Sequence, residues 1–282
     1  MLINHTNNKR IKKMSTNEKI EEIRTILNDR FKGLEFQEEG HKYSLNGVNL
    51  PSVSSIVERF CHEFDADSKA IGVAIKEGKS VEEILREWKY ENLKSTITGT
   101  LVHEFGESMA WMRDGNLDGI TESCKCKYDK TLGTLIPTRK KEEAIVSFFN
   151  DLPANYRFVT AEARVHSLAG DLNLKNPYCG TFDLLIHYEG NEMEGLILFD
   201  YKNNKTLTKD YARNKKIMML PPFDDMYDEP LGHYTVQQSL YQLCIESVGL
   251  KVIGRRLIHV KDDGTYQLYR LNDVTEKLKK IL

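Results

Sequence analysis

Apolar residues are most concentrated in the segment 178–202. Two apolar runs, 182–186 and 196–199, flank the polar stretch 189–194. Short apolar runs on either side of a polar turn are typical of paired strands, and runs this continuous indicate deeply buried ones. The pattern predicts a β-hairpin at the centre of the fold.

Apolar residues spaced by three and four positions predict helices on both sides of this hairpin. Ser15 and Glu18 form a capping box before the first helical pattern, and Ser80 and Glu83 cap another. Further helices are expected at 53–60, 68–75, 99–112, 140–149 and 234–248, with a strand at 158–167 and hairpins that pair 34–36 with 43–45 and 254–260 with 265–271.

This order of elements predicts an α/β fold with a mixed central β-sheet flanked by helices. Residues 1–14 are polar and basic, and we expect a disordered tail there. The remainder, 15–282, shows no repeat or internal boundary and is expected to form a single domain. Its first part, 15–98, would add helices and a hairpin to a core formed by 99–282.

Charged residues lie inside the central hairpin. Asp183 is in the first strand, Asp200 ends the second, and Lys202 follows. Because strand side chains alternate between faces, Asp200 and Lys202 point the same way while Tyr201 points away. Buried charges are costly unless they pair or hold a metal ion, so the pattern indicates a cation site or an ion pair at a strand end.

Composition narrows the possible partners and compartments. The net charge is −2 with a pI of about 6.5, so a nucleic-acid partner would have to bind a local basic patch. Five scattered cysteines without a signal peptide favour free thiols in a reducing cytoplasm. Cys124 and Cys126 lack a second pair, so no zinc or iron–sulphur framework is expected. No apolar run approaches the ~18 residues of a membrane span.

Four short motifs follow one another along the chain. They are a glycine-x-x-x-histidine helix from Gly99 to His103, Asp183 in GTFD, Asp200 with Lys202 in DYK, and a glutamine-x-x-x-tyrosine helix from Gln237 to Tyr241. In this order they resemble the PD-(D/E)XK nuclease superfamily, specifically its RecB-like exonuclease branch. The stretches LPSVSSIV, GTLVHEFGE and HYTVQQSLYQL look like phage-encoded members, and the resemblance covers roughly residues 34–270.

The chain departs from the family pattern at several points. Phe182 stands where the family name has proline, the acid before Lys202 is aspartate, and the cysteine cluster of the iron–sulphur members is missing. The resemblance implies a restriction-endonuclease-like core and a metal-dependent DNA nuclease, more an exonuclease acting on ends or single strands than a sequence-specific endonuclease. It also implies protein partners in recombination or repair, and the bacterial host cytoplasm if the chain is phage-encoded. The oligomeric state stays open.

Phosphodiester hydrolysis fits the residues themselves. One or two Mg²⁺ or Mn²⁺ ions would activate water and neutralise phosphate charge, held by Asp183, Asp200 and the backbone carbonyl of Tyr201. An imidazole from His103 would favour Mn²⁺, unless His103 is only a hydrogen-bonded helix residue. Lys202 would orient the attacking water or help to deprotonate it.

The remaining site residues have two interpretations each. Glu162 would bind a second metal or Lys202, or lie on the surface. Glu107 would contact the imidazole of His103 or form a salt bridge. Gln237 and Tyr241 would bond to phosphate or to the site carboxylates, or only pack.

The densest cationic run follows the candidate site. It is either a solvated face or a track for a phosphate backbone, with an aromatic side chain able to stack on a base; its members are Lys205, Lys209, Tyr211, Arg213, Lys215 and Lys216. Residues 221–230 would form a lid or pack on the core. Other functions that fit are a silent nuclease-fold module that binds nucleic acid or protein, a structure-selective endonuclease, and a phosphatase for small phosphoesters.

Overall fold

The computed structural model describes residues 14–282 except 38, 41, 114–125 and 130–133, and describes only the backbone of 126–129, 134 and 135. The expected tail 1–14, apart from Met14, and Cys124 lie outside the described residues. The helices are α1 Thr16–Phe31, α2 Val53–Glu58, α3 Ala66–Glu77, α4 Val81–Arg113, α5 Arg139–Asp151, α6 Asp210–Lys215, α7 Pro230–Glu246 and α8 Thr275–Ile281, with a 3₁₀ turn at Asp171–Asn173.

A five-stranded sheet lies at the centre, in the order β10–β9–β8–β7–β6. Its strands are β6 Tyr156–Ser167, β7 Tyr178–Glu189, β8 Glu194–Lys202, β9 Val252–Val260 and β10 Tyr266–Arg270. Neighbours are antiparallel except β8 and β9, which run parallel. The sheet is therefore mixed, as predicted, and the expected central hairpin is β7–β8.

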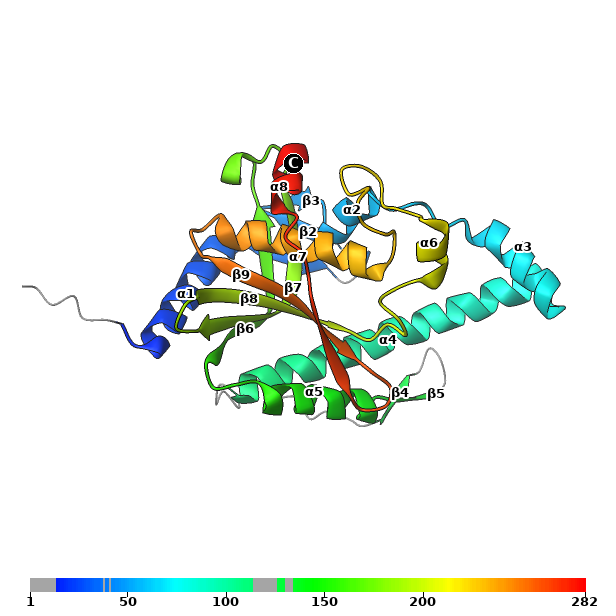
Figure 1. Cartoon of the computed structure of the whole chain (residues 1–282), viewed down its shortest axis with the longest axis horizontal. Helices are drawn as coiled ribbons and strands as arrows, with labels where there is room; N and C mark the ends of the chain where they lie inside the picture. Colours follow the sequence, from blue (N-terminus) through cyan, green and yellow to red (C-terminus); the bar gives the residue numbers. More distant parts are fainter. Residues whose placement is uncertain (1–13, 38, 41, 114–125, 130–133) are drawn as a thin grey trace, which may run out of the picture.

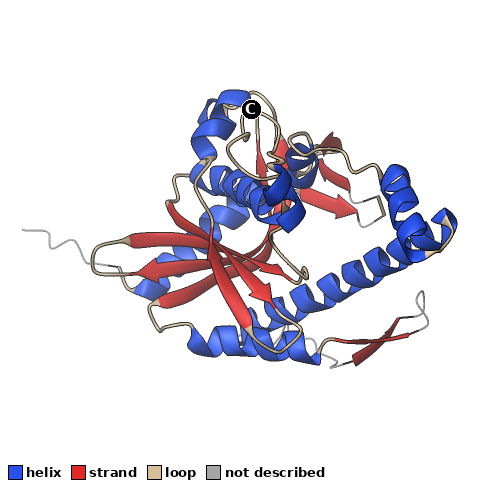
Figure 2. Ribbon diagram, turned by 45° about the vertical axis from the view of Figure 1, so that its right-hand side comes forward, coloured by secondary structure: helices blue, strands red, loops and turns tan. Residues whose placement is uncertain are grey.

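Helices cover both faces of this sheet (Figures 1 and 2). On one face α4 and α5 bury Phe199, and on the other α1, α2, α7 and α8 bury Leu198. A strand with both faces covered has no polar side to present to solvent, so its sequence becomes an unbroken apolar run. This arrangement explains the two apolar runs of the hairpin.

Smaller sheets lie at the periphery. The predicted hairpin near the N-terminus gains a third strand, giving β1 Leu34–Gln37, β2 Lys42–Leu45 and β3 Val48–Leu50. Strands β4 Cys126–Asp129 and β5 Thr134–Pro137 form a separate pair. In the described part of the chain, no helix is both long and apolar enough to cross a membrane.

One sequence prediction is corrected here, and one open alternative is decided. The helices expected from Ser80 and at 99–112 form one helix of 33 residues, α4, so the boundary placed at 98/99 falls inside it. Its N-terminal half extends beyond the sheet and packs on α3 (Figure 1). The residues between the part that packs on α3 and the part that packs on the sheet therefore show little apolar periodicity. Of the two alternatives left open for residues 221–230, the structure shows packing, because Phe223 is fully buried against Phe60.

Candidate functional site

The candidate site lies where β7 and β8 stop pairing. The last paired residues are Leu184 and Phe199. Beyond them the backbone N–H of Tyr201 donates to Asp183 Oδ2 at 2.7 Å, so a carboxylate replaces the missing strand partner. The predicted aspartate thus sits at the opening of the hairpin, with only 6% of its surface exposed.

Helix α4 brings His103 to this point. Its Nε2 lies 3.1 Å from the carbonyl oxygen of Tyr201, and its Nδ1 lies 3.4 Å from both Glu162 Oε1 and Asp183 Oδ2. A carbonyl can only accept, so Nε2 carries a hydrogen and Nδ1 faces the carboxylates. Burial disfavours the charged imidazole, but Asp183 and then Glu162 outweigh it and raise the pKa of His103 to about 9.

Glu162 reaches the site through an unusual backbone conformation. Its φ is +47° in the middle of β6, a region that residues other than glycine rarely occupy. Its Oε1 is buried and, among the residues that the structure describes, has only the long contact with His103. Backbone strain of about 1–3 kcal/mol of this kind is found at functional sites, where the surrounding structure holds it in place.

His103, Glu162 and Asp183 form a group that fits a divalent cation. One donor atom from each lies within 4.8 Å of the others. Two carboxylates and one imidazole suit Mn²⁺ or Mg²⁺, and the imidazole favours the former. The carbonyl of Tyr201, predicted as a ligand, instead accepts from His103 and fixes which ring nitrogen faces the carboxylates.

Asp200 makes its contacts with other side chains, beside this group. It is fully buried; its Oδ2 pairs with Lys202 Nζ at 2.6 Å, and its Oδ1 accepts from Gln238 Nε2 at 2.9 Å. The predicted common face of Asp200 and Lys202 is therefore found. The sharing of an ion by Asp183 and Asp200 stays a prediction; the side chains that approach Asp183 directly are His103 and, beside it, Glu162.

The charges of this second group follow from burial. Burial and the nearby charge of Asp183 raise the pKa of Asp200 to about 6, although Lys202 opposes them. Burial lowers the pKa of Lys202, but Asp200 and Asp183 outweigh it and raise this pKa above its ordinary value. The ammonium also lies 4.4 Å from the centre of the Tyr234 ring, a cation–π contact. In this state Lys202 is a fixed positive charge rather than a base.

Other predicted site residues lie further from the centre. Glu107 is half-buried beside His103 but makes no hydrogen bond or ion pair with it among the described residues. Tyr241 is buried and packs on Phe182. Gln237 is half-buried, and its neighbour Gln238 provides the amide that holds Asp200. Gln238, which the sequence pattern did not single out, is thus an additional residue of the site, and the role predicted for Gln237 stays a prediction.

An open pocket of about 750 Å³ lies in front of His103 and Glu162. Aromatic side chains of the N-terminal sheet form one wall, and the exposed side of α4 forms another; the lining comprises Phe36, Tyr43, Thr96, Gly99, Thr100, His103, Glu104, Glu107, Glu162, Arg164 and Thr181. Acidic groups outnumber the single arginine. Sequence reasoning missed Phe36, Tyr43 and Arg164, which carried no motif.

The predicted basic run does not line this pocket. Lys205, Lys209, Lys215 and Tyr211 are exposed, in keeping with either a solvated face or a binding surface. Lys216 is also exposed. Arg213 is different, because its guanidinium binds the buried carboxylate of Glu229 at 2.7 Å. We assign it to holding α6 against the start of α7, not to a free cationic track.

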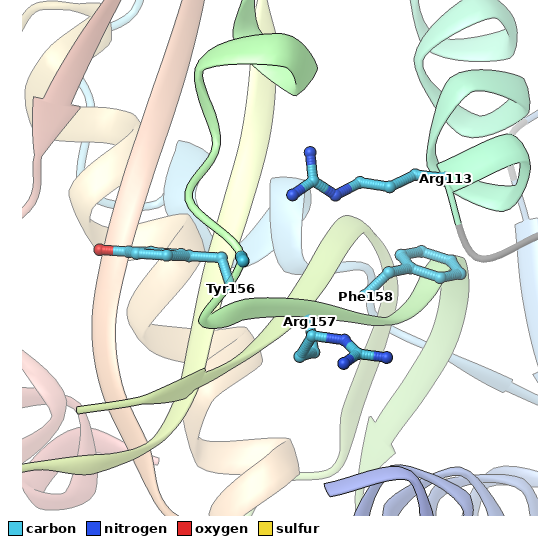
Figure 3. A pocket seen from close by; sticks show the side chains of 5 residues that line it. Arg113, Tyr156, Arg157 and Phe158 are labelled. Carbon is cyan, nitrogen blue, oxygen red and sulfur yellow. The ribbon is translucent and has the colours of Figure 1, made fainter. Parts of the chain in front are cut away.

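A second hollow lies at the far end of α4. It has a volume of about 290 Å³ and is lined by Arg113, Ala154, Tyr156, Arg157 and Phe158 (Figure 3). Arg113 donates to the carbonyls of Phe149 and Leu152, and Arg157 donates to Asn17. These arginines already have partners, and the hollow contains no predicted site residue.

Comparison with known proteins gives no independent identification. No model of a known protein family matches the chain, and no curated protein is similar to it.

Proposed function

We propose that this protein is a metal-dependent nuclease of the PD-(D/E)XK type, built on a restriction-endonuclease-like core. It would hydrolyse phosphodiester bonds in DNA and act as an exonuclease on ends or single strands. The observation that carries the proposal is the convergence of His103, Glu162 and Asp183 beside an open pocket, with Lys202 nearby. The preference for an exonuclease rests on the motif resemblance alone.

The charge of the pocket supports a cation requirement. Glu104, Glu107 and Glu162 line it, together with the cation Arg164 and with His103, whose proton a metal ion would displace. A phosphodiester would be repelled by this surface unless positive charge were bound first. A divalent ion held by His103, Glu162 and Asp183 would neutralise phosphate charge and lower the pKa of a water molecule.

The chain's own residues have distinct roles in this proposal. Nε2 of His103 donates to the Tyr201 carbonyl and so keeps Nδ1 aimed at the two carboxylates. Lys202, whose pKa is raised by Asp200 and Asp183, would orient the attacking water and balance charge on the phosphate. Asp200 positions Lys202, and Gln238 in turn positions Asp200.

A matched pair of variants tests the proposal. Glu162 and Glu107 both line the pocket, but only Glu162 contacts His103. With Mn²⁺ or Mg²⁺ and labelled linear DNA, single- or double-stranded, we expect Glu162→Gln to lower the cleavage rate by roughly 100-fold or more, since it loses a site carboxylate. Glu107→Gln should stay within a few-fold of the unmodified protein.

A comparison of linear with circular DNA as the substrate distinguishes an exonuclease from a structure-selective endonuclease. An exonuclease would degrade linear DNA and leave a closed circular plasmid intact, whereas a structure-selective endonuclease would also cut circles at branches or loops. Absence of metal-dependent cleavage of every DNA tested by the unmodified protein would contradict the proposal and favour a nuclease-fold binding module.

A further inference from the structure

A second group of metal-binding side chains lies outside the candidate nuclease site. Cys61, Asp228 and His233 each offer one donor atom, and these atoms lie within 4.8 Å of one another. All three residues are half-buried. They come from three segments: the residues after α2, the loop before α7, and the first turn of α7.

The hydrogen bonds around the group already hold the ligand-bearing segments together. The N–H of Leu220 donates to the carbonyl of Phe60 at 2.8 Å, and the N–H of His62 donates to Asp228 Oδ2 at 2.8 Å. The N–H of Asp228 donates to Ile217 at 2.9 Å. Since Oδ2 is engaged by the backbone, Oδ1 is the oxygen left to face His233. This support is what a ligating carboxylate needs to keep its orientation.

His233 binds Asp228 directly. Its Nε2 lies 2.5 Å from Asp228 Oδ1. His233 Nε2 and Asp228 Oδ1 now share a proton. Together with Cys61 Sγ, they could instead bind a metal ion placed between the three atoms. A cysteine–histidine–aspartate nucleophile is less consistent with the geometry, because Cys61 Sγ donates to the Val57 carbonyl at 3.3 Å and has no hydrogen bond to His233.

We propose that Cys61, Asp228 and His233 form a Zn²⁺ site that ties the end of α2 and the loop before α7 to the first turn of α7. One thiolate, one imidazole and one carboxylate are a donor set that Zn²⁺ accepts in tetrahedral coordination, with water or a fourth group completing it. Mg²⁺ and Mn²⁺ prefer oxygen ligands to thiolate sulphur, so the site discriminates against the two ions expected at the nuclease site.

The consequence for the fold lies in α7. His233 is in the first turn of this helix, and Gln238, little more than one turn later, holds Asp200. Fixing the start of α7 to two other segments would therefore stabilise the side of the molecule that supports Asp200 and Lys202. No side chain is shared between the two candidate sites.

Cobalt distinguishes this site from the nuclease site, because only a thiolate ligand gives the sulphur-to-cobalt charge-transfer band in the near ultraviolet. When metal-free full-length protein is titrated with Co²⁺, we expect this band to saturate at one equivalent. The variants Cys61→Ser and His233→Gln should lose it or weaken it strongly. His103→Ala and the double variant Cys124→Ser/Cys126→Ser should retain it.

Zinc provides two further measurements, and the first of them uses only the unmodified protein. X-ray absorption of the unmodified protein loaded with one equivalent of Zn²⁺ should show one sulphur at about 2.3 Å. Zn²⁺ at ~100 times its dissociation constant should raise Tm by roughly 5 °C, and Cys61→Ser should remove that part of the rise. A zinc shell of nitrogen and oxygen alone, or a cobalt band that survives Cys61→Ser, would overturn the proposal.

Discussion

The imidazole of His103 faces the carboxylates of Asp183 and Glu162 with its Nδ1. In the metal-free protein this nitrogen carries a proton, at the position where a divalent ion would bind. Asp183 and Glu162 stabilise that proton and raise the pKa of His103 to about 9 although burial opposes it. A metal ion that takes Nδ1 as a ligand must displace the proton first. Metal binding and protonation therefore compete at a single atom.

This competition predicts the pH dependence of metal affinity. Between about pH 7 and pH 8.5 the association constant for Mn²⁺ should rise up to tenfold per pH unit, with close to one proton released per ion. Calorimetry in buffers of different ionisation enthalpy measures both quantities. His103→Gln should bind Mn²⁺ more weakly and with a flatter pH profile. An affinity for Mn²⁺ that is constant across this range in the unmodified protein would contradict the assignment of the proton.

The same pKa predicts how the metal-free protein responds to alkali. The folded-state pKa of His103 is raised from 6.5 to about 9, so its contribution to stability is fully present below 6.5 and is lost as the pH rises through 9. When Mn²⁺ is added to the metal-free protein, the gain in stability should be largest at the alkaline end of the range from pH 6.5 to about 9.

Residue identities in the site were predictable to different extents. Asp183, Asp200 and Lys202 are charged residues in or beside apolar strands, and this contrast is visible in the sequence. Glu162 was left open, because nothing in a strand sequence reveals a φ of +47°. Gln238 was missed in favour of Gln237, since α7 is buried on nearly all sides and its apolar pattern does not show which glutamine faces the sheet.

Among the elements, strands β7 and β8 were predictable because both of their faces are buried. Helix α4 was predicted in two pieces because its apolar positions follow two partners, α3 at its start and the sheet at its end. The middle of α4 is packed closely neither on α3 nor on the sheet. Three threonines there, Thr96, Thr98 and Thr100, donate to carbonyls one turn earlier, so their hydroxyl groups are hydrogen-bonded within the helix.

Two glycines on α4 give a prediction about how closely it approaches β8. A Cβ on Gly106 would lie 2.6 Å from the ring of Tyr201, which is 1% exposed and cannot move aside. A Cβ on Gly99 would have no neighbour closer than 3.9 Å. Alanine favours a helix over glycine by about 1 kcal/mol, whereas overpacking costs about 1–3 kcal/mol.

Gly99→Ala should therefore raise the free energy of unfolding by about 0.5–1 kcal/mol. Gly106→Ala should lower it by up to about 2 kcal/mol, the overpacking cost less the helical gain. Urea unfolding followed by circular dichroism measures both. If Gly106→Ala were as stable as Gly99→Ala, the close contact between α4 and Tyr201 would be wrong.

For the whole molecule, the sequence indicated a mixed sheet but not its strand order. The parallel pairing of β8 with β9 depends on α6, α7 and the loops between them crossing from one strand to the next, and that connection has little apolar periodicity before α7. The net charge of −2 also gives no general attraction for nucleic acid. If DNA binds, its affinity must come from a local group of cations.

Salt dependence tests whether that group is the run 205–216. Lys205 and Lys215 are exposed and make no ion pair in the described structure, whereas Arg213 is bound to Glu229. Each lysine that neutralises a phosphate of single-stranded DNA releases counterions and steepens the plot of log affinity against log salt by about 0.7. The double variant Lys205→Ala/Lys215→Ala should thus flatten the slope by about 1.4.

Arg213→Ala serves as the matched control. It leaves the carboxylate of Glu229, 3% exposed, without its guanidinium, so it should lower the free energy of unfolding by about 1–3 kcal/mol and leave the salt slope nearly unchanged. Anisotropy of a labelled oligonucleotide over a range of NaCl, in Ca²⁺ or chelator to prevent cleavage, gives the slope. An unchanged slope in the double lysine variant would assign the run to a solvated surface and direct the search for the DNA-binding surface to Arg164 and the aromatic wall of the pocket.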